Sequence, residues 1–363
     1  MMSTTTSPPP PTESVEPPRE TKSLVRGTLP RWAPWGVLAA AAVISALAVS
    51  LSGLGVAPFV LLTAVLHTAG IAAWSRWVEG RRKAADRSFT AVVTSAFLLA
   101  LTPLISVVVT VVSKGMNRFD ARFFTYSMRG VVGEGGGAYH AIMGTLITSG
   151  LAALMSVPIG LATAIYLVEY GQGKLARAIT FFVDVMTGIP SIVAGLFAYA
   201  LFALVFGPGT VNGFAGAVAL SVLMIPIVVR SSEEMLKIVP DDLREAAFAL
   251  GTPKWKVILR VVLPTAVAGI STGVTLALAR VVGETAPLLI ATGATGSTNL
   301  NPFSGQMATL SVFSYYEYAS PGVPVEPSLD RAWTAALTLM LIVMVLNLVA
   351  RSFSLLFAPK AGR

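Results

Sequence analysis

The chain has 363 residues, of which 54% are hydrophobic and only 12% are charged, and it carries a formal net charge of +8. Soluble globular domains carry about 25% charged residues, so this composition excludes a soluble protein and indicates a chain that lies in a lipid bilayer. There is no cysteine, which excludes disulfides and thiolate metal sites. His67 and His140 are too few for a metal cluster and are interpreted as packed or interfacial histidines.

Eight long, weakly charged runs predict an all-α polytopic membrane protein with about eight transmembrane helices. Most of the runs reach the ~20 residues that cross a hydrocarbon core. They cover residues 32–54, 56–74, 88–113, 141–168, 178–206, 214–229, 261–290 and 332–350. The first run resembles a secretory signal in its basic flank, but the seven spans after it predict an uncleaved anchor.

The runs divide the chain into four predicted segments. Residues 1–31, rich in Pro, Ser and Thr, predict a disordered cytoplasmic tail. Residues 32–113 predict an N-terminal block of three transmembrane helices, and 114–138 an external connection. Its sequence GEGGG lacks the Lys-Ser or Lys-Thr of a phosphate-binding loop and is interpreted as a flexible linker. Residues 139–359 predict a five-span transmembrane core.

The positive charge follows the predicted topology of these spans. Most of the 26 lysines and arginines fall in the segments on one side, which the positive-inside rule assigns to the cytoplasm. Both termini then lie in the cytoplasm, and residues 291–330 lie outside. This distribution explains the basic composition without nucleic acid, so membrane lipid is the expected surrounding and no nucleic-acid partner is expected.

A polar segment over 241–264 interrupts the hydrophobic core. Pro240, Asp242 and Glu245 predict a helix start with a capping-box spacing, and Gly251 predicts a left-handed end. A second short helix is expected after Pro253. The apolar positions of the two helices are Leu243, Ala246, Ala247 and Leu250, then Trp255, Ile258, Leu259 and Val262. Neither helix is long enough to span, so we expect both to lie at the cytoplasmic face, packed on the spans, as an interfacial loop or a docking element.

Charged and polar residues inside the spans are candidates for a substrate pathway. Arg280 and Glu284 are expected near the middle of one helix at i and i+4, where they either pair with each other or line a path for an oxyanion. Asp184 is expected to be an interfacial carboxylate with a local partner. The Pro190–Ser191 break serves either close packing or a pathway. The hydroxyls of Ser271, Thr272, Thr275 and Thr285 bond either an anion or their own backbone.

These motifs resemble a known family. The sequence Glu245-Ala246-Ala247, with Gly251 and then Leu263-Pro264 at the family's spacing, resembles the EAA loop of ABC-importer permeases. The stretches ARVVGETAPLL (279–289) and TGIPSIVAGLFAY (187–199) resemble PstA-type permeases of phosphate ABC importers, over residues 140 to 355. The resemblance implies a permease subunit rather than an enzyme, in the bacterial inner membrane. It implies a pathway formed between two related permeases, and Arg280, Glu284, Ser191 and Thr285 are the residues of this chain that we expect to line it.

The same resemblance implies the partners. They are a PstC-type permease, two cytoplasmic PstB-type ATPase subunits, one of which receives the loop in a groove, and an external PstS-type phosphate-binding protein. ATP and Mg would be bound by the ATPase, so no cofactor is expected on this chain. Alternatives are a permease for molybdate or sulfate, the PstC-type subunit itself, or a secondary anion transporter. A secondary carrier has no use for an ATPase-docking loop, and a membrane enzyme would need catalytic clusters that the sequence lacks.

Overall fold

The structure is a computed structural model that describes residues 27–53 and 55–357, and the regular structure in this part of the chain is helical. Residues 1–26 of the predicted tail, and the last residues of the predicted core, lie outside the described residues. The chain forms two compact units that divide between Val107 and Val108. This boundary lies inside the helix in which the sequence placed the end of the N-terminal block, at 113.

The first unit contains helix α1 (Ala33–Ser52), helix α2 (Val56–Val78) and most of helix α3 (Arg81–Gly115). Gly53 takes a left-handed conformation, with a φ of 65°, and turns the chain from α1 into α2. The rings of Trp32 and Trp74 meet edge to face at 6.2 Å, which holds the start of α1 against the end of α2. The two helices therefore form an antiparallel hairpin.

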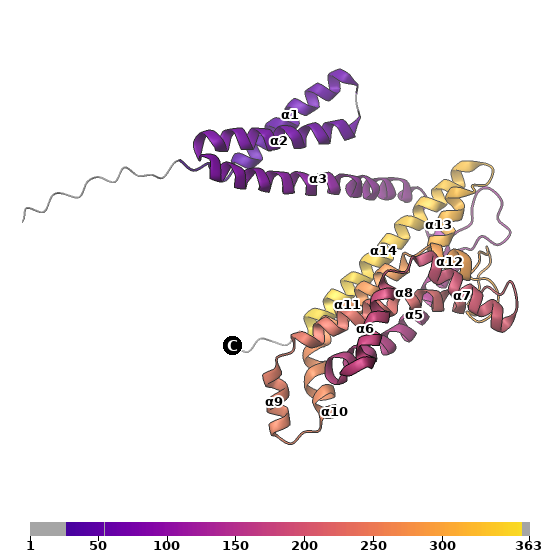
Figure 1. The fold of residues 1–363 in the computed structure, drawn as a ribbon. Helices are drawn as coiled ribbons and strands as arrows, with labels where there is room; N and C mark the ends of the chain where they lie inside the picture. Colours follow the sequence, from indigo (N-terminus) through magenta and orange to yellow (C-terminus); the bar gives the residue numbers. More distant parts are fainter. Residues whose placement is uncertain (1–26, 54, 358–363) are drawn as a thin grey trace, which may run out of the picture. The chain divides into compact units, whose positions relative to one another are not determined.

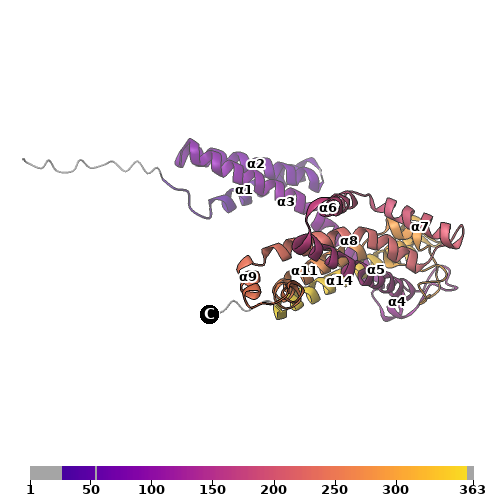
Figure 2. The same ribbon diagram turned by 60° about the horizontal axis from the view of Figure 1, so that its bottom comes forward.

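The second unit contains the remaining helices (Figures 1 and 2). In chain order they are η1 (Met116–Arg118), α4 (Ala121–Thr125), α5 (Tyr139–Ile165), the π-helical turn η2 (Tyr166–Tyr170), α6 (Gly173–Thr187), α7 (Ser191–Phe206), α8 (Gly213–Ile238), α9 (Asp241–Ala249), α10 (Lys254–Val257), the π-helical turn η3 (Ile258–Val262), α11 (Leu263–Val282), α12 (Ala286–Ala291), α13 (Leu310–Ala319) and α14 (Val325–Phe357).

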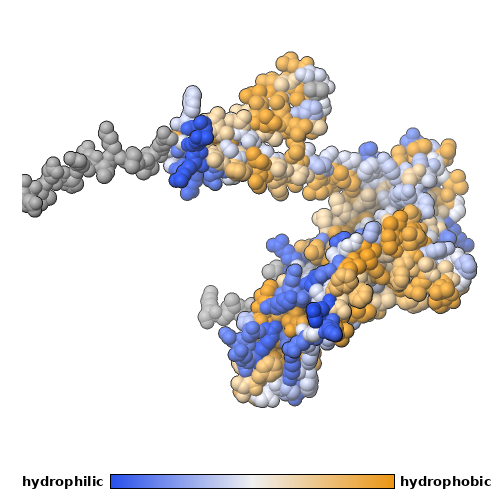
Figure 3. All heavy atoms as spheres, in the orientation of Figure 1, coloured by the Kyte–Doolittle hydropathy of each residue, from blue (hydrophilic) through white to orange (hydrophobic). Residues whose placement is uncertain are grey.

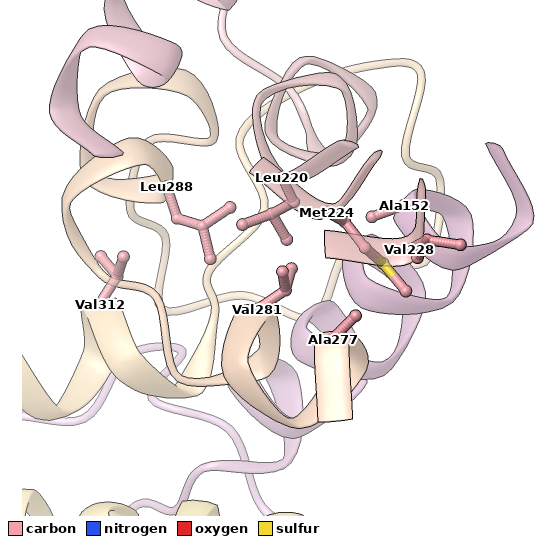
Figure 4. Close-up of a cluster of buried hydrophobic side chains, with 8 residues drawn as sticks. All are labelled: Ala152, Leu220, Met224, Val228, Ala277, Val281, Leu288 and Val312. Atoms are coloured by element: carbon pink, nitrogen blue, oxygen red, sulfur yellow. The ribbon is translucent and has the colours of Figure 1, made fainter. Parts of the chain in front are cut away.

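Helix α8 lies at the centre of this unit and is its most buried span. Small residues let its neighbours approach closely. A Cβ on Gly160 of α5 would meet Val228 at 2.7 Å, and a Cβ on Gly273 of α11 would meet Ser231 at 2.5 Å. Figure 4 shows the apolar cluster that results, formed by Ala152, Leu220, Met224, Val228, Ala277, Val281, Leu288 and Val312.

The pairing of α5 with α8 fixes the path of the chain between them. Ser221 donates to the carbonyl of Ala152 at 3.4 Å, and Gly160 faces Val228 further along. The two helices therefore run in the same direction, so the segment that joins them has to return to the opposite end of the unit. Helices α6 and α7 make this return, with a bend of 108° between them.

The predicted all-α, multi-span fold is confirmed. Within residues 27–53 and 55–357, seven single helices are long and apolar enough to cross a membrane, and the bent pair α6–α7 makes an eighth. The bend corrects the expectation of one helix over 178–206. Pro190 has no amide hydrogen and disfavours a helical conformation in the residue before it, which ends α6 and starts α7 anew.

The connection at 114–138 is more ordered than a flexible linker. It contains η1 and α4, and Phe123 of α4 is fully buried. Arg331 of α14 donates to the carbonyls of Gly133 and Gly135 at 2.8 and 3.2 Å, and to Glu317 of α13 at 2.9 Å. The glycine run therefore serves as an acceptor for a buried arginine.

Candidate functional site

Helix α9 and the turn after it project from one end of the second unit (Figure 1). The helix begins at Asp241, directly after Pro240, and ends at Ala249. Gly251 has a φ of 74°, as its position after the helix predicts, and a Cβ placed there would meet nothing within 4 Å. The expected capping box is not formed, because no side chain caps the start of α9.

The apolar face of α9 points away from the spans, contrary to the prediction. Leu243, Phe248 and Leu250 are 42%, 43% and 86% exposed, and only Ala247 packs on the neighbouring core. Glu245 and Ala246 are exposed as well. Figure 3 shows hydrophilic residues gathered at this end of the unit, interrupted by apolar ones. Exposed apolar surface of this kind is typical of a surface that a partner or lipid covers.

The second amphipathic segment is not a separate short helix. Helix α10, η3 and α11 form one continuous helix over Lys254–Val282 that is long enough to span. Ile258 and Val262 are buried, whereas Trp255 and Leu259 are 56% exposed. The π-helical turn ends at Val262, two residues before Pro264, which cannot donate to the carbonyl four residues earlier, so the helix widens there instead of breaking. Leu263 is partly buried and Pro264 is exposed.

Arg244 attaches α9 to the rest of the unit. Its guanidinium donates to the carbonyls of Val239 and Leu236, at 2.6 and 3.0 Å, where α8 ends, and the Leu236 carbonyl also accepts from the Val239 amide at 3.4 Å. It also donates to Glu169 at 3.2 Å and to Asp241 at 2.9 Å. The Arg244 and Glu169 side chains are only 13% and 7% exposed. The fork geometry of arginine suits this set of divergent acceptors.

The turn η2, which contains Glu169, also binds the helix on the other side of Gly251. Lys254, at the start of α10, donates to the carbonyl of Glu169, and its ammonium lies 4.7 Å from the centre of the Tyr170 ring. The π-helical turn η2 therefore contacts both halves of the loop, through Arg244 and Lys254. The sequence analysis missed Glu169 and Arg244, because they are 75 residues apart and no local pattern connects them.

Arg280 lies in the last turn of α11 instead of the middle of a helix. Gly273 faces Ser231 and Gly269 faces Met235, so α11 runs antiparallel to α8. This register places Arg280 level with Met224, near the middle of α8. Arg280 is exposed on the same face as Thr272 and Leu276, and within the described residues the structure records no ion pair or hydrogen bond for its side chain.

Glu284 does not continue the helix of Arg280, which corrects the expected i, i+4 arrangement. Helix α11 ends at Val282, and Glu284 lies in the break before α12. Its backbone is held on both sides, since its amide donates to Val281 at 3.1 Å and its carbonyl accepts from Ser311 at 2.8 Å. Among the described residues, no ion pair joins the two charged side chains. An intramolecular Arg280–Glu284 pair is therefore absent from this part of the chain.

The two helix breaks of the unit lie close to each other. A Cβ on Gly195 of α7 would meet Pro287 of α12 at 2.6 Å, so α7 and α12 pack tightly. Ala198 and Phe202 cluster with Ala291 further along, so the two helices run in parallel from their starts at Ser191 and Ala286. Ser191 is half-buried, and Thr285 lines a cavity of ≈ 570 Å³ with Ser311 and Ser314. Ser191 and Thr285 thus lie at the starts of neighbouring half-helices.

Other candidates have local partners. Asp184 of α6 forms an ion pair with Arg230 of α8, as expected of an interfacial carboxylate, and Arg230 also binds Glu233 at 2.8 Å. Thr272 and Thr275 donate to backbone carbonyls one turn earlier, at 2.9 and 3.0 Å. This self-bonding is the ordinary role of hydroxyls in membrane helices.

Comparison with known proteins assigns this chain to a family. Residues 156–363 match the family described as binding-protein-dependent transport system inner membrane component. The chain belongs to this family. The prediction of a membrane permease component rather than an enzyme is thereby confirmed, and the family description places the chain in the inner membrane, in a transport system that depends on a binding protein.

Individual relatives agree with the family. A "Phosphate transport system permease protein PstA 1" of Mycobacterium tuberculosis is 46% identical over 273 residues, covering 74% of this chain and 88% of that protein. A "Phosphate transport system permease protein PstA" of Yersinia pestis is 38% identical, covering 73% and 88%. A bacterial alginate ABC transporter structure matches 74% of this chain and 94% of its own, with a TM-score of 0.55 and 15% identity, and supports the fold alone.

Proposed function

We propose that this chain is a permease subunit of an ATP-driven importer of inorganic phosphate, and that it forms the translocation pathway with a PstC-type partner permease. The relatives that support this proposal are named PstA, and they include proteins of Mycobacterium and Yersinia. The match covers most of their length and includes the helices on both sides of the helix breaks.

The observation that carries the proposal is the exposed guanidinium of Arg280. A charge at the centre of a bilayer costs about 2.5–3.5 kcal/mol or more, so an unpaired arginine at that level does not face lipid. The exposed face of α11 that carries Arg280 and Thr272 is then covered by the partner permease or by the pathway. Arginine presents a planar fork that matches the oxygens of a tetrahedral oxyanion.

The projecting loop supplies the coupling to ATP. Its exposed positions Glu245, Ala246 and Leu250 would enter a groove of a PstB-type ATPase subunit, one copy for each permease. Ala247, Gly251, Leu263 and Pro264 would shape and anchor the loop. ATP and Mg would be bound by the ATPase, so this chain needs no cofactor of its own. Both termini and the loop would lie in the cytoplasm, and a PstS-type protein would deliver phosphate at the opposite end.

Phosphate is favoured over molybdate or sulfate by the names of the relatives, since a single arginine does not distinguish among these anions. The test is uptake into vesicles that contain the chain assembled with a partner permease and ATPase, with a phosphate-, sulfate- or molybdate-binding protein outside. Phosphate uptake that requires ATP and the phosphate-binding protein is the expected result. Transport of sulfate or molybdate in its place, or uptake without ATP, would contradict the proposal.

A further inference from the structure

A cavity of ≈ 510 Å³ lies inside the N-terminal unit, where α1, the second half of α2 and the start of α3 face one another. Its volume is in the range of small-molecule sites, about 300–1,000 Å³. The cavity is partly open, since Trp35, Lys83 and Asp86 in its lining are exposed, so a molecule from the surroundings can enter it.

The cavity has one polar wall and one apolar wall. Lys83, Asp86, Arg87 and Thr90 line it from α3, at the spacing of one helix face. Trp35 and Leu38 of α1, with Ile71 of α2, form the apolar wall. An occupant that matches both walls is amphipathic along its length.

Two of the charged groups in the cavity, Glu79 and Arg87, already form an ion pair with each other. Glu79 accepts from Arg87 at 2.5 and 2.8 Å, from the Leu29 amide at 2.8 Å and from Ser75 at 2.8 Å. These hydrogen bonds, chiefly that of Arg87, outweigh burial and lower the pKa of Glu79 to about 2. This ionised pair is structural and leaves little binding capacity for an occupant.

The remaining polar groups lack such partners. Lys83 and Asp86, one cation and one anion, are exposed, and the structure records no ion pair for either among the residues it describes. His67 lines the cavity, is 4% exposed, and has Nδ1 3.5 Å from the Ser95 hydroxyl. Its Nε2 is buried and has no hydrogen-bond partner among the residues that the structure describes. Buried polar groups without partners are rare, and a titratable group inside a membrane segment indicates a functional site.

We propose that this cavity binds one zwitterionic phospholipid with a primary ammonium head group, of the phosphatidylethanolamine kind. The phosphate lies against Lys83 and the ammonium against Asp86. The glycerol ester region meets the polar wall that ends at His67, and an acyl chain follows Trp35, Leu38 and Ile71. A free anion fits less well, because the apolar wall gives it nothing to bind and the Asp86 carboxylate offsets the charge of Lys83, while Arg87 is already paired with Glu79.

The test uses the full chain in its assembled transporter, reconstituted in phosphatidylglycerol vesicles that contain a phosphatidylethanolamine probe with a diazirine on one acyl chain. After irradiation, mass spectrometry maps the labelled peptides. The expected result is labelling of the peptides around Ile71 and Ala91, which both line the cavity. Lys83→Gln should lower this labelling about tenfold, since it removes a charge-assisted hydrogen bond. Ala91→Trp, which fills the cavity, should abolish it.

Lys174→Gln is the matched control, because Lys174 is an exposed lysine at the start of α6 with no ion pair among the described residues. It should leave labelling unchanged. Gel filtration verifies assembly of each variant, and if Ala91→Trp does not assemble, Lys83→Gln and the competition experiments decide. Unlabelled phosphatidylethanolamine should compete with the probe, and extra phosphatidylglycerol and inorganic phosphate should not.

Three results would overturn the proposal. Equal competition by phosphatidylglycerol would show ordinary surrounding lipid without head-group selection. Displacement by inorganic phosphate would show a site for the free anion. Absence of labelling in the wild-type complex, or equal labelling in Lys83→Gln and wild type, would show that the cavity does not hold the lipid. None of these outcomes depends on transport, so the result is independent of the function proposed for the core.

Discussion

Replacing Arg244 by alanine should release α9 from the spans. The substitution removes two charge-assisted hydrogen bonds to the carbonyls at the end of α8 and leaves Glu169 buried without its cation. Truncating one partner of a buried ion pair costs about 3–5 kcal/mol. The contact with Asp241 adds little, because that carboxylate is 85% exposed. A cost of about 3 kcal/mol raises the population of the detached loop by about a hundredfold.

Hydrogen exchange of the assembled transporter measures this opening directly. The amides of α9 and of the turn at Gly251 should exchange up to about a hundredfold faster in Arg244→Ala than in the wild type, and ATP-driven uptake should fall. Arg260→Ala is the matched control, since Arg260 is an exposed arginine of the same loop with no ion pair among the described residues. Adding Glu169→Ala to Arg244→Ala should restore part of the protection, because no buried charge is then left unpaired. Equal exchange in Arg244→Ala and Arg260→Ala would refute the role given to Arg244.

Three further predictions concern other parts of the chain. Gly251→Val should lower ATPase co-purification and uptake, because a β-branched residue is strained at a φ of 74° by at least about 1–2 kcal/mol; normal values of both would count against the role of the turn. Because the pKa of Glu79 is depressed, its contribution to stability is complete above the ordinary carboxyl pKa and is lost only as the pH falls towards about 2. The Leu29 amide, which donates to Glu79, should therefore stay protected from hydrogen exchange between pH 7 and pH 5, after correction for the intrinsic exchange rate. Loss of this protection between pH 7 and pH 5 would contradict the assignment. A cysteine at Ser297 should be labelled from outside the cell in this cysteine-free chain, and labelling only from the cytoplasm would reverse the proposed topology.

Hydropathy and helix punctuation predicted most of the fold, because spans and their ends are local properties of the sequence. Pro240 and Gly251 set the two ends of the projecting helix as expected. The direction of its apolar face was predicted wrongly. Periodicity shows that Leu243 and Leu250 share a side of the helix, but the surface that covers that side belongs to the arrangement of the whole assembly.

For the site residues too, the sequence predicted local features but not contacts between distant segments. Pro287 follows Glu284 closely, and a proline in the first turn of a helix signals that a new helix begins there. The sequence analysis did not use that signal, and it therefore placed Arg280 and Glu284 in one helix, whereas a break separates them. No comparable signal exists for Arg244 and Glu169, whose contact depends on the return of the chain through α6, α7 and α8.

The central claim is that Arg280 attracts the transported anion at the midpoint of the pathway, and it is tested most directly by phosphate uptake in vesicles, normalised to assembled transporter. Uptake should fall in the order wild type, Arg280→Lys, Arg280→Gln, because lysine keeps the charge but loses the fork and glutamine loses both. The double variant Arg280→Gln with Glu284→Gln should stay as low as Arg280→Gln alone, since no ion pair joins the two side chains in the described chain. Wild-type uptake in the double variant would show that the two charges serve only to neutralise each other, and would contradict the anion site.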